Sequence, residues 1–430
     1  MTCADAAPRA VLRVRSAVAR AREAARRVDA ATPAGRDRAV DGLRALALGG
    51  VVSGHWLLGG LTLRPDGALD SASPLVALPE LAPLTWLFQL LGLFFLVGGY
   101  ASVRSWDRAA ARGLGTGGWL RGRLRRLGRP VGALAVGCTV LACELHSVGV
   151  PDGTLRTGLV RIAQPLWFLA VYAVLTALTP YCDRAVGRAG GWPAAALLLW
   201  VAAVDLLRYG PYGDAVPAAV GLLTVLPGWL FGYVLGVAWG RGRLGPGGAW
   251  LLLVGGVVLL AVLVGPGGYP VSTVGVPGAG RTNSHPPSLL VPALAAAQCG
   301  AAVLLYGPLT RLLRRPLLWA PVAAVNVAAL TVLCWHQCAP LVFAVPAAAW
   351  PGEVPGLVGA PDSVSWLLWR CAWLPLFTAV LVVLVRWAWQ FEHGPKRRTG
   401  PPGTGGQGPA PRPTPGPAAG AVRTTRGPPR

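Results

Sequence analysis

The segment RAVDGLRALALGGVVSGHWLLGG, from Arg38 to Gly60, decides how the rest of the chain is interpreted. It is apolar enough to cross a membrane but contains Asp41, Arg44 and His55, and an ionisable side chain inside a spanning helix is costly and indicates function. Arg44 and His55 are eleven residues apart, so they share one helix face, with roughly 16 Å between them along the axis. Asp41 precedes Arg44 by three residues and can pair with it on that face. The alternative is that Arg44 reaches the membrane interface and His55 bonds a neighbouring helix.

The composition places the chain among membrane proteins. Of its 430 residues, 53% are hydrophobic and 13% are charged, whereas a soluble domain carries about 25% charged residues. Apolar runs of about twenty residues recur along the chain and are separated by segments rich in Arg, Pro or Gly. We therefore expect an all-α, polytopic membrane protein, placed in the plasma membrane of a bacterium and in contact with membrane lipid.

Ten spanning helices are expected, and the positions of the arginines set their orientation. The expected spans are residues 39–60, 81–103, 127–146, 158–179, 192–208, 217–239, 249–266, 288–307, 319–347 and 364–391. With a cytoplasmic N-terminus, the cytoplasmic segments hold 31 of the 39 Lys and Arg residues and the outer loops hold three. This distribution follows the positive-inside rule and predicts that both termini are cytoplasmic. It also explains the net charge of +22 without a nucleic-acid partner.

The chain divides into three parts on this interpretation. Residues 1–38 form an Arg/Ala-rich cytoplasmic extension that lacks the pattern of a signal peptide, and it can lie on an anionic leaflet or extend into water. Residues 39–391 form the transmembrane domain. Residues 392–430 are dominated by Pro, Gly and Arg, which predicts a disordered cytoplasmic tail. The eight cysteines lie mostly inside apolar runs, so no disulfide framework is expected.

The opening segment resembles the signature of the acyltransferase 3 family, whose members are integral-membrane O-acyltransferases. The resemblance rests on DGLRALA, residues 41–47, followed by His55 at eleven residues after Arg44. Weaker family-like elements follow in the right order, including Phe94-Phe95 in the second span and PLWFL, residues 165–169, in the fourth. The family often has Ser-Gly after the Phe pair, whereas this chain has two glycines, which predict close helix packing. Family members with an appended soluble hydrolase-like domain exist, and none is expected here.

Five arginines lie in the sequence WLRGRLRRLGRP, residues 119–130, just before the third span. Arg123 and Arg126 match the spacing of an Arg-x-x-Arg motif that recurs at this place in the family. Arginine binds phosphate through two parallel hydrogen bonds, and a coenzyme A donor brings phosphates to the cytoplasmic face. The resemblance therefore implies that Arg123 and Arg126 bind acyl-CoA. The alternative is that these arginines only set the membrane topology.

Two further residues are candidates for the catalytic site. Glu144, near the outer end of the third span, can orient His55 if the two meet, since a carboxylate raises the basicity of an imidazole. The alternative places Glu144 at the wet outer interface. His336, in the ninth span, matches a histidine that the family often has in a late span. Cys334 and Cys338 flank it but share a helix face from which His336 points away, so no metal site is expected.

The resemblance implies transfer of an acyl group, such as acetyl, from cytoplasmic acyl-CoA to a hydroxyl of a saccharide or of another extracytoplasmic or lipid-linked acceptor. Arg123 and Arg126, with Arg44 deeper in the membrane, would hold the donor. His55 would deprotonate the acceptor hydroxyl or carry the acyl group itself, and the sequence leaves both routes open. Asp41 would support Arg44 as its ion-pair partner.

Two other classes of protein fit parts of the same sequence. A secondary transporter or flippase for a lipid-linked saccharide also has many spans, broken helices and intramembrane charges, but the halves of this chain show no convincing internal repeat. A membrane scaffold with basic tails would not need Arg44 and His55 on one buried face. Dependence of activity on acyl-CoA distinguishes an acyltransferase from a transporter or flippase.

Overall fold

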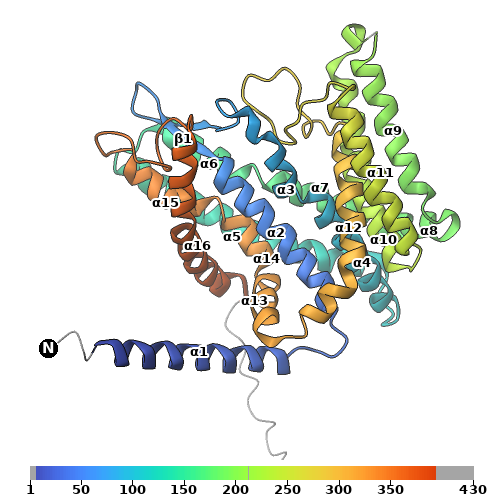
Figure 1. Cartoon of the computed structure of the whole chain (residues 1–430), viewed down its shortest axis with the longest axis horizontal. Helices are drawn as coiled ribbons and strands as arrows, with labels where there is room; N and C mark the ends of the chain where they lie inside the picture. The colour runs from blue at the N-terminus through green and yellow to red at the C-terminus, as the bar shows by residue number, and fades with distance from the viewer. Residues whose placement is uncertain (1–5, 212, 394–430) are drawn as a thin grey trace, which may run out of the picture. The chain divides into compact units, whose positions relative to one another are not determined.

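The computed structural model describes residues 6–211 and 213–393, and their regular structure is almost entirely helical (Figure 1). The α-helices are α1 (Ala6–Ala30), α2 (Arg38–Leu58), α3 (Thr85–Phe88), α4 (Leu91–Ala110), α5 (Thr116–Ser147), α6 (Asp152–Ala163), α7 (Leu166–Ala177), α8 (Thr179–Ala189), α9 (Trp192–Tyr209), α10 (Val225–Gly240), α11 (Pro246–Val264), α12 (Leu290–Leu312), α13 (Pro316–Val327), α14 (Ala329–Trp335), α15 (Cys338–Ala347) and α16 (Val364–His393). Short 3-10 helices are η2 (Pro79–Leu84), η3 (Gly213–Ala215) and η4 (Ala218–Thr224). Strands β1 (Gly60–Leu63) and β2 (Leu69–Ala72) form an antiparallel hairpin, the one sheet within the described ranges. The predicted disordered tail lies, apart from its first two residues, outside the described residues.

The helices confirm the expected class of protein. Among the residues that the structure describes, nine helical stretches are long and apolar enough to cross a membrane. Each overlaps one of the expected spans from the second to the tenth. Helix α2, which corresponds to the first expected span, is 21 residues long and is not among these nine stretches, since it contains Asp41 and Arg44 and is less apolar. The chain is therefore a polytopic all-α membrane protein.

Helix α2 lies among other helices and packs against α3, α4, α12, α13 and α14 (Figure 1). Its buried side chains recur at the three- and four-residue spacing of one helix face, as at Val40, Leu43 and Ala47. Asp37 caps its N-terminus, because the carboxylate accepts a hydrogen bond from the backbone N–H of Val40 at 3.2 Å. The helix that carries the charged residues is thus also part of the core.

The ninth expected span, residues 319–347, is not one continuous helix. It consists of α13, α14 and α15, with breaks at Ala328 and at His336-Gln337. Pro340 explains the second break, because proline has no N–H to donate to the carbonyl four residues earlier and its ring crowds that carbonyl. That carbonyl belongs to His336, and it accepts a hydrogen bond from the indole Nε1 of Trp56 in α2 at 2.9 Å. The break therefore ties this span to α2.

Close backbone contact holds α4 against α10. A Cβ atom built on Gly99 of α4 would lie 2.1 Å from the carbonyl oxygen of Tyr233, and one on Gly236 of α10 would lie 2.0 Å from that of Leu96. Helix α5 is packed less densely than α10. In the most apolar part of α5, 17% of the residues are buried, against 61% in the stretch that contains α10. Glycine thus allows two helix backbones to touch, as the glycines after the Phe pair predict.

We expect Gly99→Ala to destabilise the protein, because the added methyl group would meet the backbone of α10, which cannot move aside locally. Overpacking of this kind costs about 1–3 kcal/mol. Gly132→Ala in α5 is the matched control, because a Cβ there meets nothing within 4 Å. The melting temperature of the detergent-solubilised protein should fall for the first variant only. Equal melting temperatures would show that α4 and α10 are not held this closely.

Candidate active site

The C-terminal end of α2 is fixed by a buried arginine on α16. Arg370 is 0% exposed and donates from Nε to the carbonyl of Trp56 at 2.6 Å and from Nη2 to that of Gly59 at 2.7 Å. Its Nη1 donates to the carbonyl of Gly356 at 3.0 Å. A cation is favoured here because the C-terminus of a helix carries a partial negative charge and unpaired carbonyls. His55 is therefore positioned by an anchored turn.

Arg44 is held within the protein by side chains on two helices. Its Nη1 donates to Oδ1 of Asp41 at 2.8 Å, as the three-residue spacing predicts, and to Oδ1 of Asn326 in α13 at 3.0 Å. Asp41 is buried and also accepts from Nε of Arg36 at 2.6 Å. Asn326 returns a hydrogen bond from Nδ2 to the carbonyl of Asp41 at 2.7 Å. This network orients the guanidinium of Arg44 instead of leaving it free to extend to the interface.

His55 and His336 form a hydrogen-bonded pair. Nδ1 of His55 lies 2.7 Å from Nε2 of His336, and the two rings are nearly parallel, at 13°. Nδ1 of His336 lies 2.8 Å from the carbonyl oxygen of Leu333, which can only accept, so this nitrogen carries the proton. Nε2 of His336 then accepts from Nδ1 of His55. The remaining nitrogen of His55, Nε2, is left with an unshared electron pair.

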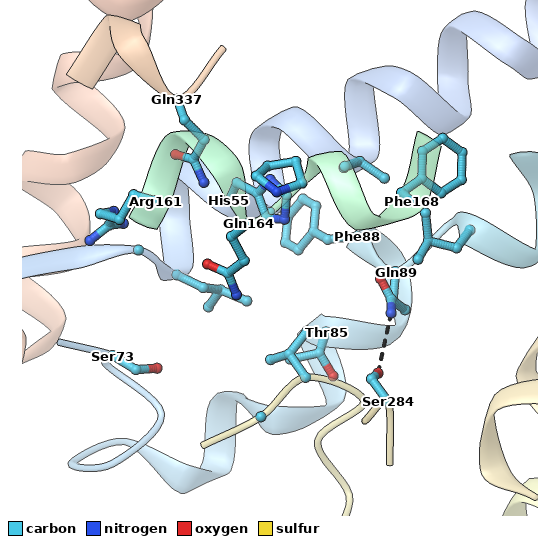
Figure 2. Close-up of a pocket in the computed structure, with 18 of the residues that line it drawn as sticks. His55, Ser73, Thr85, Phe88, Gln89, Arg161, Gln164, Phe168, Ser284 and Gln337 are labelled. Atoms are coloured by element: carbon cyan, nitrogen blue, oxygen red, sulfur yellow. Dashed lines mark hydrogen bonds between the residues drawn. The ribbon is translucent and has the colours of Figure 1, made fainter. Parts of the chain in front are cut away.

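His55 lies in the wall of a cavity of about 340 Å³ at the C-terminal half of α2 (Figure 2). The predicted topology places this end of α2 outside, so we call this space the outer cavity and the one beside Arg44 the inner cavity. Besides His55, the polar side chains that line this cavity come from five segments of the chain: Ser71, Ser73, Thr85, Gln89, Arg161, Gln164, Ser284, His285 and Gln337. Aromatic rings of Phe88, Phe94, Trp167 and Phe168 complete it, and none of its described lining residues is Asp or Glu. Burial lowers the pKa of His285, so that imidazole is neutral at pH 7. The cavity thus offers hydrogen bonds and flat apolar surfaces without negative charge.

Arg161 is the charged residue of this cavity that the sequence interpretation missed. It lies on α6, is buried, and donates from Nη1 to the carbonyl of Gly60 at 2.6 Å. Within the described ranges no carboxylate pairs with Arg161 or with Arg370. The available signal was an arginine inside an expected span, which by itself indicates a functional site. Arg161 therefore brings positive charge into the wall that also holds His55.

An inner cavity of about 240 Å³ brings three of the predicted arginines together. Arg44 from α2 and Arg123 and Arg126 from α5 all line it, with Asn326 and Tyr172. Nη2 of Arg123 also donates to Oγ of Ser102 at 3.4 Å. The three arginines come from two segments, with Arg44 and Arg123 lying 79 residues apart in the chain, and they line the same space.

Glu144 is not part of either cavity. It is exposed at the outer end of α5, and the side chain that bonds His55 is His336. The expectation that Glu144 orients His55 therefore finds no support in this geometry. In the described part of the chain no group of three or more His, Cys, Asp or Glu side chains could hold a metal ion.

Comparison with known proteins agrees with this arrangement. The chain matches the family described as "Acyltransferase domain", the acyltransferase 3 family, over residues 37–389. It belongs to this family of membrane acyltransferases. Comparisons with curated proteins and with solved structures gave no match.

We expect Arg370→Met to lower the stability of the fold, because three buried carbonyls would lose their donor. An unsatisfied buried acceptor costs about 1–3 kcal/mol, so the loss should be roughly 3 kcal/mol or more. Arg386→Met on the exposed face of the same helix is the control. Thermal unfolding in detergent should separate the two variants. If both unfold like the unchanged protein, Arg370 does not anchor the end of α2.

Proposed function

We propose that this membrane acyltransferase moves a short acyl group, such as acetyl, from cytoplasmic acyl-CoA to a hydroxyl group of an acceptor in the outer cavity. The observation that carries the proposal is the distribution of groups along α2. Arg44 lines the inner cavity with Arg123 and Arg126, while His55, whose Nδ1 bonds His336 and whose Nε2 keeps a free electron pair, lines the outer cavity. One helix thus links a cationic donor site to a base.

The donor would bind with its phosphates at the inner cavity. Three arginines line this cavity, and one carboxylate, that of Asp41, pairs with one of them. Arginine can bind phosphate through two parallel hydrogen bonds, and its charge is permanent. The thin pantetheine arm of coenzyme A would then extend along α2 and carry the thioester toward His55.

His55 would act as a general base on the acceptor. As the hydroxyl oxygen attacks the thioester carbonyl carbon, its proton moves to Nε2 of His55, and the C–O bond forms. The C–S bond then breaks, and the departing thiolate of coenzyme A takes the proton from Nε2. The hydrogen bond to His336 supports the positive charge that His55 carries between these steps, which makes His336 a positioning residue.

A covalent route uses the same geometry. The free electron pair on Nε2 of His55 can attack the thioester carbonyl itself, so that the C–S bond breaks, coenzyme A leaves as its thiolate, and the ring carries the acyl group. The acceptor hydroxyl oxygen then forms the ester bond as the N–C bond breaks, and its proton goes to the thiolate. In both routes negative charge develops on the carbonyl oxygen. Arg161 is in the cavity wall with His55 and supplies positive charge for that oxygen.

The lining of the outer cavity favours a hydroxylated acceptor, for which a saccharide is our choice. Amide side chains such as Gln164 and Gln337 can both donate and accept hydrogen bonds, as sugar hydroxyls require. Trp167 offers a flat apolar face. We place the reaction in the plasma membrane of a bacterium, with the acceptor reached from the outer side or attached to a lipid.

The first test measures transfer of radiolabelled acetyl from acetyl-CoA in membranes that contain the protein or a variant. His55→Ala should reduce transfer by about 100-fold or more, which is the usual contribution of a general base. His146→Ala is the matched control, because that histidine is exposed and pairs with Asp152 outside the cavities. Loss of transfer in both variants would point to folding, and transfer by His55→Ala at the normal rate would remove His55 from the mechanism.

The second test separates donor binding from membrane topology, using two double variants of α5 with the same change in charge. Arg123→Gln with Arg126→Gln should raise the KM for acetyl-CoA about tenfold or more, because both side chains line the inner cavity. Arg121→Gln with Arg125→Gln should leave KM unchanged, because neither lines it. Equal effects of the two pairs would mean that these arginines act only on topology.

A further inference from the structure

The two cavities along α2 share part of their walls. Among the described lining residues, Phe94 of α4 and Phe168 of α7 are the two that border both the inner and the outer cavity. Their ring centroids lie 4.8 Å apart, and the planes are nearly perpendicular, at 86°. These rings therefore separate the space that holds the arginines from the space that holds His55.

The position of this partition can be read along α2. Arg44 lines the inner cavity, whereas Leu48, one turn further, lines the outer cavity. The partition therefore lies within about 6 Å of helix rise, on the inner side of His55. His55 follows Leu48 by seven residues, which adds roughly 10 Å. A thioester that starts from the inner cavity must pass the two rings before it reaches Nε2 of His55.

The rings are held in place by further aromatic contacts. Phe168 is 4% exposed and packs against Phe95 at 5.2 Å and Tyr172 at 6.2 Å between ring centroids. Phe94 is less buried and contacts Tyr172 at 5.9 Å. Edge-to-face and stacked pairs of this kind fix ring orientation beyond what burial alone does. The two rings thus meet edge to face and close the way between the cavities in this structure.

We infer that Phe94 and Phe168 form the slot that selects the size of the transferred acyl group. This inference rests on the proposed function, because it assumes that the thioester moves from the inner to the outer cavity. Because the two rings touch in this structure, the slot opens only when one of them turns aside, and the thin pantetheine arm with a small acyl group needs the smallest movement. A branched acyl group has a larger cross-section and must displace a ring further, which raises the barrier to its passage. Differences of one or two methyl groups in such a site change kcat/KM by about 10- to 200-fold.

The test compares transfer from radiolabelled acetyl-CoA and isobutyryl-CoA into membranes that contain each variant. Phe94→Ala removes the less buried ring. At the more buried Phe168 we use the smaller change Phe168→Leu, because removal of the whole side chain there would destabilise the fold. We expect the isobutyryl-to-acetyl ratio of kcat/KM to rise about tenfold or more in both. Phe343→Ala is the matched control, because Phe343 packs against Trp373 and Phe377 and lines neither cavity.

The outcomes separate this inference from the proposed function. An unchanged ratio in folded Phe94→Ala, with acetyl transfer retained, would overturn the slot and leave the acyltransferase mechanism standing. The same rise in Phe343→Ala would also overturn it, because the effect would not depend on the partition. If the unchanged protein transfers label from neither donor, the proposed donor fails and the slot fails with it. Size-exclusion profiles identify folded variants before the rates are compared.

Discussion

The hydrogen bond between His55 and His336 joins residues 281 positions apart, and the geometry of the outer cavity depends on it. His336 lies at the break between α14 and α15. Pro340 causes that break and frees the carbonyl that Trp56 uses, while Arg370 fixes the carbonyl of Trp56 itself. The orientation of the His55 ring thus depends on contacts among α2, the end of α14 and α16, and none of these contacts involves a carboxylate.

Positive charge without a carboxylate partner is the second feature that organises this end of the bundle. Arg161 and Arg370 donate to carbonyls of Trp56, Gly59, Gly60 and Gly356, and the partial negative charge at the end of α2 favours both cations. A carboxylate nearby would neutralise them. Because the carbonyls are neutral, the net charge remains, and a negative charge that forms transiently in the outer cavity is stabilised without displacing an existing partner.

The sequence predicted what depends on periodicity and composition: the spans, the shared face of Arg44 and His55, and the pairing of Asp41 with Arg44. It also indicated Arg123, Arg126 and His336 through family resemblance. What it could not supply is which helices are neighbours. The contact of Asn326 with Arg44 and that of His336 with His55 depend on a broken helix, whereas the sequence was interpreted as one continuous span. Glu144 was chosen for its depth in the membrane, but depth does not determine which neighbours a side chain meets, and Glu144 is exposed and lines neither cavity.

The unequal packing of the helices has a consequence for how a large donor enters. His55 is on α2, which is enclosed by five other helices, whereas Arg123 and Arg126 are on α5, where few residues of the apolar part are buried within the protein. Segments with few buried contacts open at lower free-energy cost than enclosed ones. Under the proposed function, the donor would therefore enter beside the less enclosed helix, while the His55–His336 pair is held among the enclosed ones. Entry and chemistry would then depend on parts of the molecule that differ in how tightly they are packed.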